Sequence, residues 1–147
     1  MTNQIHYQKA LEQAKKSYHE GGIPIGAALI HNDKVVGEGH NQRVQKSSPI
    51  LHGEMDCFEN AGRQSDYSKM TLYTTLSPCM MCSGTIIQFK IKKVVIGENI
   101  NFEGNIDFLK EHGVQVEVLN DTETINLMSR FIKEHPKLWN EDISIQD

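Results

Sequence analysis

Residues 70–89, MTLYTTLSPCMMCSGTIIQF, join an apolar run to a segment that opens with Pro78 and carries Cys79 and Cys82. The run MTLYTTL has the apolar and β-branched composition of a buried strand. Proline is tolerated in the first turn of a helix, so we expect a helix directly after the strand. Two cysteines three positions apart at a helix start can bind one ion, and the positive end of the helix dipole favours their thiolate forms. This junction is the first candidate for chemistry.

The flanking segments alternate between helical and strand patterns. We expect helices over residues 4–19, 52–64 and 105–113, a hairpin of strands at 23–30 and 34–41, strands at 92–98 and 114–119, and a last helix from the N-cap Asp121 to the stop at Pro136. Helices that alternate with buried strands after a hairpin are typical of an α/β sheet covered on both faces. The end of the chain has no strong period, yet it carries Trp139, the single tryptophan.

Length and composition narrow the class of protein. A chain of 147 residues predicts one domain, and no apolar run approaches the roughly 20 residues that cross a bilayer. The first residues contain no apolar signal-peptide segment, so we expect a cytoplasmic protein. Three cysteines, two of them in one C-x-x-C, favour metal or redox chemistry over a structural disulfide. The net charge of -4 argues against a nucleic acid as the main partner.

A second polar cluster lies at residues 50–62, ILHGEMDCFENAG. A C-x-x-C alone fits either zinc or thioredoxin-like redox chemistry, and an added imidazole favours zinc. His52 and Cys57 would point about 140° apart on a helix, so only one of them can join the two cysteines while the other packs in the core. Three protein ligands leave a position for water, and Glu54 could take the proton of that water. The strings HGE and PCMMC match the H-x-E and P-C-x-x-C signature of zinc deaminases.

On these residues the chain resembles the cytidine deaminase superfamily, and within it the fungal-type cytosine deaminases that act on the free base. The matching strings are GGIPIGAALI, GHNQR, LHGE, LYTTLSPCMMC, VVIGENINF and WNEDI. The resemblance implies a three-layer α/β/α fold with a five-stranded mixed sheet. It also implies a single zinc-dependent deaminase domain over residues 1–147, with residues 137–147 as a C-terminal lid, and a homodimer.

The resemblance further implies one zinc ion per chain, held by His52, Cys79 and Cys82, with Glu54 as proton shuttle. The implied reaction is the hydrolysis of cytosine to uracil and ammonia in pyrimidine salvage, with a zinc-bound hydroxide attacking C4. The implied substrate contacts are Asn41 at the polar edge of the pyrimidine, the Gly53 N–H at the ring carbonyl, the Ser77 carbonyl at the exocyclic amine, Phe102 and Trp139 as aromatic walls, Asp142 as a polar partner and Ile23 beneath the ring.

Simpler interpretations stay open beside this one. Asp56 is expected to be a surface acid on its helix, and Cys57 a small buried side chain. Asn41 also suits a turn that ends the hairpin. The alternative functions are deamination of another small aminoheterocycle (guanine, isocytosine or creatinine), deamination of adenosine in tRNA, which needs a basic groove, and a non-enzymatic zinc module with four protein ligands.

Overall fold

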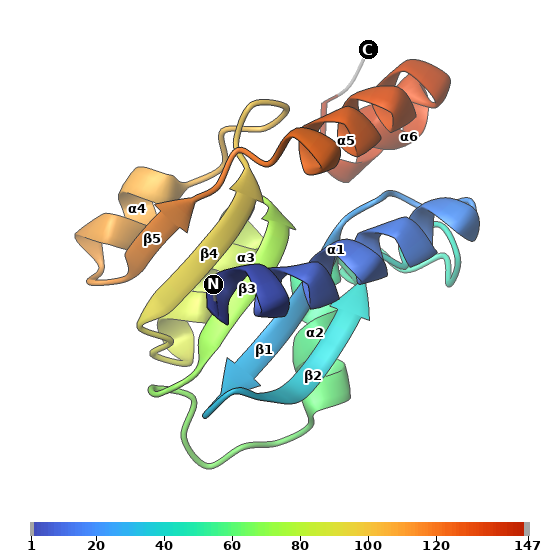
Figure 1. Cartoon of the computed structure of the whole chain (residues 1–147). Coiled ribbons are helices and arrows are strands. Elements are labelled where there is room, and N and C mark those ends of the chain that lie inside the picture. Colours follow the sequence, from blue (N-terminus) through green and yellow to red (C-terminus); the bar gives the residue numbers. More distant parts are fainter. Residues whose placement is uncertain (1, 146–147) are drawn as a thin grey trace.

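The structure is a computed structural model that describes residues 2–145 (Figure 1). Its elements in chain order are α1 (Thr2–His19), β1 (Gly26–His31), β2 (Lys34–His40), α2 (Gly53–Ala61), β3 (Thr71–Leu76), α3 (Met80–Gln88), β4 (Lys93–Glu98), α4 (Ile106–Glu111), β5 (Gln115–Val118), α5 (Thr122–Glu134) and α6 (Pro136–Asp142). None of the helices in this part of the chain combines the length and the apolar composition that a membrane span requires.

The strands form one five-stranded sheet in the order β2-β1-β3-β4-β5. Strand β1 is antiparallel to β2 and β3, whereas β3, β4 and β5 run parallel. Apolar side chains of α2, α3 and α4 pack on one face of the sheet, and those of α1 and α5 pack on the other. Figure 1 shows α1 crossing in front of the sheet and α2 and α3 behind it. The predicted three-layer α/β/α architecture with a mixed sheet is confirmed.

Four chain segments meet at one end of this sheet. The parallel strands β3 and β4 both end there, with Leu76 paired to Glu98. Strand β1 begins at the same end, where Gly26 pairs with His40, the last residue of β2. Loops at the carboxyl ends of parallel strands commonly carry the ligand site of an open α/β sheet. Helices α5 and α6 lie beyond this end (Figure 1), so the last part of the chain comes close to the strand termini.

Two glycines allow α2 to approach the sheet closely. A Cβ atom on Gly39 of β2 would lie 2.4 Å from the backbone nitrogen of Cys57 in α2. A Cβ atom on Gly53, the first residue of α2, would lie 2.9 Å from the carbonyl oxygen of Ile25. Both contacts are with backbone atoms that cannot rotate away. The glycines therefore fix the depth at which the N-terminal end of α2 sits against the strands.

The expected elements all form, and the structure adds one that the sequence pattern did not predict. Asp121 caps α5 as expected, since its carboxylate accepts a hydrogen bond from the Thr124 backbone N–H. Gly113 ends the α4 segment with a φ of 85°, which a glycine adopts readily. Pro136 stops α5 but also opens α6, a helix of 7 residues. Proline suits the first turn of a helix, and 7 residues are too few to show a clear period.

Candidate active site

The N-terminal ends of α2 and α3 bring three metal-binding side chains together. His52 and Cys79 are the N-cap residues of these helices, and neither side chain caps its own helix. The Nδ1 atom of His52 lies 3.4 Å from the Sγ atom of Cys79 and 3.8 Å from that of Cys82. All three ligand atoms lie within 4.8 Å of one another. Tetrahedral zinc with ordinary Zn–N and Zn–S bonds separates such atoms by roughly 3.6 Å, so the donor set fits one zinc ion.

The sulfur atoms interact strongly with each other and with the imidazole. A hydrogen bond from the Cys82 thiol is the main cause that lowers the pKa of Cys79 to about 4. The same contact, together with burial, raises the pKa of Cys82. Burial alone would lower the pKa of His52, but the contact with Cys79 and the charge of Asp142 outweigh it and raise this pKa to about 9. A zinc ion held here would bind both sulfur atoms as thiolates.

Glu54 lies in the first turn of α2, and only 4% of its surface is exposed. Burial raises the pKa of its carboxyl group to about 7, and the negative charge of Cys79 adds to the effect. It lines a small inner cavity together with His52 and Cys79. A carboxyl group that changes charge near neutral pH can both accept and donate a proton there. Its position beside the metal donors suits it to proton transfer at that point.

Two adjoining cavities share the metal-binding region. The inner one has a volume of about 20 Å³, and its lining adds Ile25, Leu76, Ser77, Phe102, Asp142 and Ile143 to the three residues above. The outer one has a volume of about 440 Å³ and opens beside Arg43, Met80 and Met81. His52, Cys79, Phe102, Asp142 and Ile143 line both cavities and so form the wall between them. The inner volume is enough for about one water molecule.

The last helix is joined to the hairpin directly beside this wall. The Asn41 side chain, fully buried at the end of β2, donates a hydrogen bond of 2.9 Å from Nδ2 to Asp142 Oδ1 in α6. The same carboxylate oxygen lies 3.7 Å from His52 Nε2. Its other charged neighbour is Arg43, whose guanidinium nitrogen lies 3.7 Å away. Asp142 therefore connects α6, the end of β2 and the proposed metal ligand.

The other residues expected to contact substrate take up different positions. Ser77 and Phe102 line the inner cavity, whereas Gly53 is buried at the start of α2 against Ile25. Trp139 packs edge-on against Phe102, with ring centroids 6.3 Å apart. Ile23 lies outside the cavity lining, in an apolar cluster with Trp139.

Three apolar residues of the inner cavity were missed by sequence reasoning: Ile25, Leu76 and Ile143. Ile25 follows Ile23 by two positions in the same β-rich run, so alternation along a strand would have made it an equal candidate. Leu76 directly precedes Ser77 and could have been found from that neighbour. Ile143 follows Asp142, but no sequence pattern distinguishes it from an ordinary apolar residue.

Cys57 and Asp56 of α2, whose places in the helix were also predicted from the sequence, behave differently from each other. Cys57 is fully buried, its thiol donates to the Gly37 carbonyl, and it belongs to the main apolar cluster, as expected for a core residue. The expectation that Asp56 is a surface acid is wrong, because it is only 2% exposed. Its side chain faces β2, where it accepts hydrogen bonds from His40 and Gln42.

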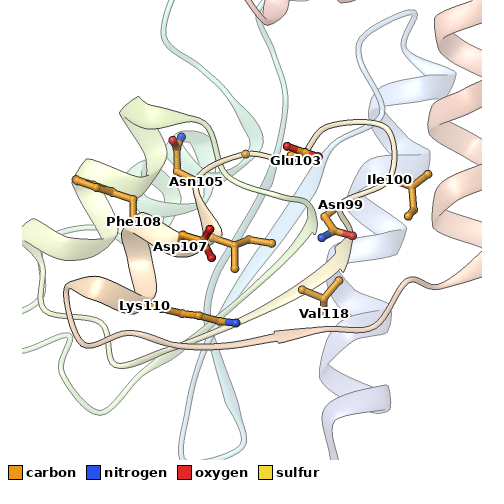
Figure 2. A pocket seen from close by; sticks show the side chains of 10 residues that line it. Asn99, Ile100, Glu103, Asn105, Asp107, Phe108, Lys110 and Val118 are labelled. Atoms are coloured by element: carbon orange, nitrogen blue, oxygen red, sulfur yellow. The ribbon is translucent and has the colours of Figure 1, made fainter.

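A wider cavity of about 730 Å³ lies away from the metal donors, beside the β4–α4 loop, α4 and β5. Figure 2 shows Asn99, Asp107 and Lys110 around it. Its charged side chains, Glu103, Asp107 and Lys110, are exposed to solvent. Buried titratable groups gather around the inner cavity instead. The inner cavity is therefore the candidate active site.

Comparison with known proteins agrees with this geometry. The family model described as the cytidine and deoxycytidylate deaminase zinc-binding region matches residues 1–98. The chain belongs to this family of zinc-binding deaminases. It is 60% identical to the cytosine deaminase of Candida albicans over 139 residues, which cover 92% of this chain and 93% of the relative.

More distant relatives carry other substrates in their names. The tRNA-specific adenosine deaminase of Streptococcus pyogenes is 32% identical, over 86% of this chain and 81% of that protein. A solved structure from work on tRNA:A34 deaminases superposes with a TM-score of 0.74 at 23% identity, covering 84% of this chain and 99% of the other. At that identity the structural likeness shows the fold alone.

Proposed function

We propose that this chain catalyses the hydrolytic deamination of cytosine to uracil and ammonia. The observation that carries the proposal is the presence of the buried Glu54 carboxyl group in the same inner cavity as His52 and Cys79. The choice of cytosine is supported by the 60% identity with the Candida albicans cytosine deaminase over nearly the whole chain.

The proposed roles follow from these positions. When bound by His52, Cys79 and Cys82, zinc supplies Lewis acidity that makes water nucleophilic near neutral pH. Glu54 accepts a proton from the attacking water and delivers it to the ring nitrogen N3, which makes C4 more electrophilic. A C–O bond then forms at C4. Glu54 then takes the proton of the new C4 hydroxyl and passes it to the exocyclic amine, the C4–N bond breaks, and ammonia leaves while the C4 carbonyl forms.

Polar groups around the cavity are proposed to orient the base. Asn41 and Asp142 would hydrogen-bond its polar edge, and the Gly53 N–H would meet the ring carbonyl. The Ser77 carbonyl would accept from the exocyclic amine. Each of these groups is buried, so a ligand that matched them would replace lost hydration with fixed hydrogen bonds.

The C-terminal segment 137–147 is proposed to act as a lid. The inner cavity of about 20 Å³ has room for about one water molecule, so a pyrimidine can enter only if part of the wall moves. Asp142 and Ile143 of the wall belong to this segment, and Trp139 supports Phe102 on the other side. Closure over the base would exclude water during the reaction. Residues 146 and 147 of the proposed lid lie outside the described residues.

The size of the inner cavity and the charge of the chain weigh against the alternatives. A single six-membered ring needs less movement of the wall than a purine such as guanine. A tRNA stem-loop would need an open, basic approach, whereas the chain has a net charge of -4, and the basic side chain of the outer cavity, Arg43, is paired with Asp142. A non-enzymatic zinc module with four protein ligands would not account for the buried carboxyl group of Glu54.

We further propose that the enzyme works in the cytoplasm, in pyrimidine salvage, as a homodimer. A reducing compartment suits its cysteines, all of which are free. The exposed apolar side chains of Ile50 and Met80 lie on the segments that precede α2 and open α3, and would be covered by a second copy. Light scattering on a size-exclusion column tests the dimer, and a monomer mass at micromolar concentration would contradict it.

The proposed function is tested with a panel of cytosine, isocytosine, guanine, creatinine, cytidine and adenosine-containing tRNA. Release of ammonia is followed for each compound with the zinc-loaded protein. We expect the highest kcat/KM with cytosine and no measurable release from tRNA. Release from tRNA or from guanine at a higher kcat/KM than from cytosine would refute the assignment.

A further inference from the structure

The buried carboxylate of Asp56 holds the two residues on either side of Asn41. Its Oδ2 atom accepts a hydrogen bond of 3.0 Å from the His40 backbone N–H. Its Oδ1 atom accepts one of 2.9 Å from the Gln42 side-chain amide. A longer contact of 3.4 Å comes from the Asn60 amide one turn further along α2. Each carboxylate oxygen of Asp56 therefore accepts a hydrogen bond from a different neighbour of Asn41.

A carboxylate in this position is costly unless its hydrogen bonds are made. Asp56 is only 2% exposed, and the ion pairs found in residues 2–145 do not include it. Burial of an unpaired charge is strongly unfavourable, so the N–H donors of His40 and Gln42 carry most of the compensation. The segment that contains Asn41 is therefore held in one place by the same bonds that make the buried charge tolerable.

The remaining contacts of Asn41 come from other elements. Its backbone N–H donates to the Ile25 carbonyl, and its carbonyl accepts from the Ser17 hydroxyl of α1. Its side-chain oxygen accepts from the Arg43 backbone N–H, which leaves the amide nitrogen to face Asp142. Asp56 is the residue through which α2, the helix that begins beside His52 and carries Glu54, reaches the Asn41 segment.

We infer that Asp56 is a positioning residue. Its hydrogen bonds hold residues 40 and 42 against α2 and so set the position of the Asn41 amide relative to Glu54. The inference rests on the proposed role of Asn41 in substrate binding. The orientation of reacting groups is sensitive to displacements of about 1 Å. Loss of the Asp56 hydrogen bonds should therefore weaken substrate binding, although Asp56 itself does not contact the substrate.

The kinetic test compares Asp56→Ala with Glu59→Ala, an exposed carboxylate on the same helix. We expect Asp56→Ala to raise KM for cytosine about tenfold with a smaller change in kcat, and to leave the zinc content unchanged. Glu59→Ala should match the wild type. In an Asn41→Ala background, Asp56→Ala should change kcat/KM less than twofold, because its effect passes through Asn41. A full tenfold further loss in that background would overturn the inference.

A conservative variant separates positioning from general damage to the fold. Asp56→Asn keeps an oxygen that can accept from the His40 N–H, and the Gln42 amide can turn so that its oxygen accepts from the new amide nitrogen. We expect Asp56→Asn to retain at least half of the affinity that Asp56→Ala loses, measured as KM. An Asp56→Asn variant no better than Asp56→Ala would contradict the geometry.

A measurement without substrate distinguishes this inference from the proposed function. In a ¹⁵N-labelled, zinc-loaded protein, the side-chain amide signals of Asn41 should shift or broaden in Asp56→Ala and stay in place in Glu59→Ala. Unchanged Asn41 signals in Asp56→Ala would overturn the positioning role, whatever the enzyme's substrate. If the wild type did not convert cytosine, the proposed function would be refuted. The Asn41 amide signals would still test the positioning role of Asp56.

Discussion

The amide of Asn41 donates to the carboxylate of Asp142 across 101 residues of sequence, at 2.9 Å. The contact joins the end of β2 to α6 beside His52, whose Nε2 atom lies 3.7 Å from the same oxygen. Two residues expected to bind substrate thus already bind each other. A base that enters the inner cavity would meet the Asp142 carboxylate, whose orientation Asn41 fixes in advance, which lowers the entropic cost of binding.

Replacing Asp142 by alanine should weaken both the fold and the reaction. The Asn41 amide would lose its partner while it stays buried, at a cost of about 1–3 kcal/mol. We expect a lower Tm and a kcat/KM at least tenfold below wild type, measured by calorimetry and by cytosine absorbance. The matched control is Glu141→Ala, which removes the exposed neighbouring carboxylate of α6. Equal effects from the two variants would contradict the role of the Asn41–Asp142 pair.

The three cysteines should differ sharply in metal retention. Cys79→Ser and Cys82→Ser each remove a sulfur that lies near His52 Nδ1, so zinc content after dialysis against a mild chelator should fall at least tenfold. Cys57→Ser should keep its zinc, because its side chain points into the core toward the Gly37 carbonyl. Elemental analysis of the dialysed proteins decides the matter. Loss of zinc from Cys57→Ser to the same extent would make Cys57, rather than one of the others, a ligand.

Trp139 is the single tryptophan and reports directly on α6. It is 6% exposed and packs edge-on against Phe102. If segment 137–147 opens and closes over the base, saturating uracil should change the intensity or wavelength of tryptophan emission in the zinc-loaded protein. Thymidine, whose sugar would require a wider opening of the wall than uracil does, serves as the control. Identical emission with and without uracil, under conditions where uracil inhibits, would count against a moving lid.

Glu98 should be required for the loop that carries Phe102. Its buried carboxylate accepts hydrogen bonds from the backbone N–H groups of Ile100 and Asn101 and from the Asn101 side chain. Glu98→Ala removes the acceptor of the two backbone N–H groups, while the Asn101 side chain keeps its contact with the Ile125 carbonyl, and the change should cost about 2–3 kcal/mol in the free energy of unfolding. Denaturant unfolding measures this, with Glu103→Ala in the exposed part of the same loop as control.

The contribution of Glu98 to the stability of the fold should also depend on pH. Burial raises the pKa of its carboxyl group in the folded protein, so the folded state binds its proton more tightly than the unfolded chain does. The contribution of Glu98 to stability therefore falls as the pH rises from the ordinary glutamate pKa of about 4.3 through the raised folded value. Relative to Glu98→Gln, wild type should lose stability over this window. A constant difference between the two proteins across it would contradict the shift.

The fold was largely predictable because its elements are marked by local signals. The helix end at Gly113 and the cap at Asp121 depend on residues adjacent in the chain, and both are confirmed. Helix α6 was not predicted, because it spans only 7 residues and owes its place to packing against α5 and the strand ends. The sequence could identify Pro136 as a boundary but not the helix that begins there.

The candidate site divides in the same way. His52, Cys79 and Cys82 were predictable because their residue types and spacing are those of a zinc site, and the structure brings their ligand atoms together. Ile143 and the buried Asp56 were not predictable, because their importance arises from contacts with distant segments. Sequence periodicity indicates which residues share a face of α2, but not that β2 covers the face on which Asp56 lies.

The most direct test of the account is the conversion of cytosine to uracil by wild type and by Glu54→Gln, followed by ultraviolet absorbance with zinc content measured on the same samples. Glutamine keeps the size of the side chain but cannot accept and return a proton. The account predicts steady conversion by the wild type and a kcat lower by roughly 10²–10⁴-fold in the variant, with zinc retained in both. Near wild-type turnover by Glu54→Gln, or no conversion of cytosine by the zinc-loaded wild type, would contradict it.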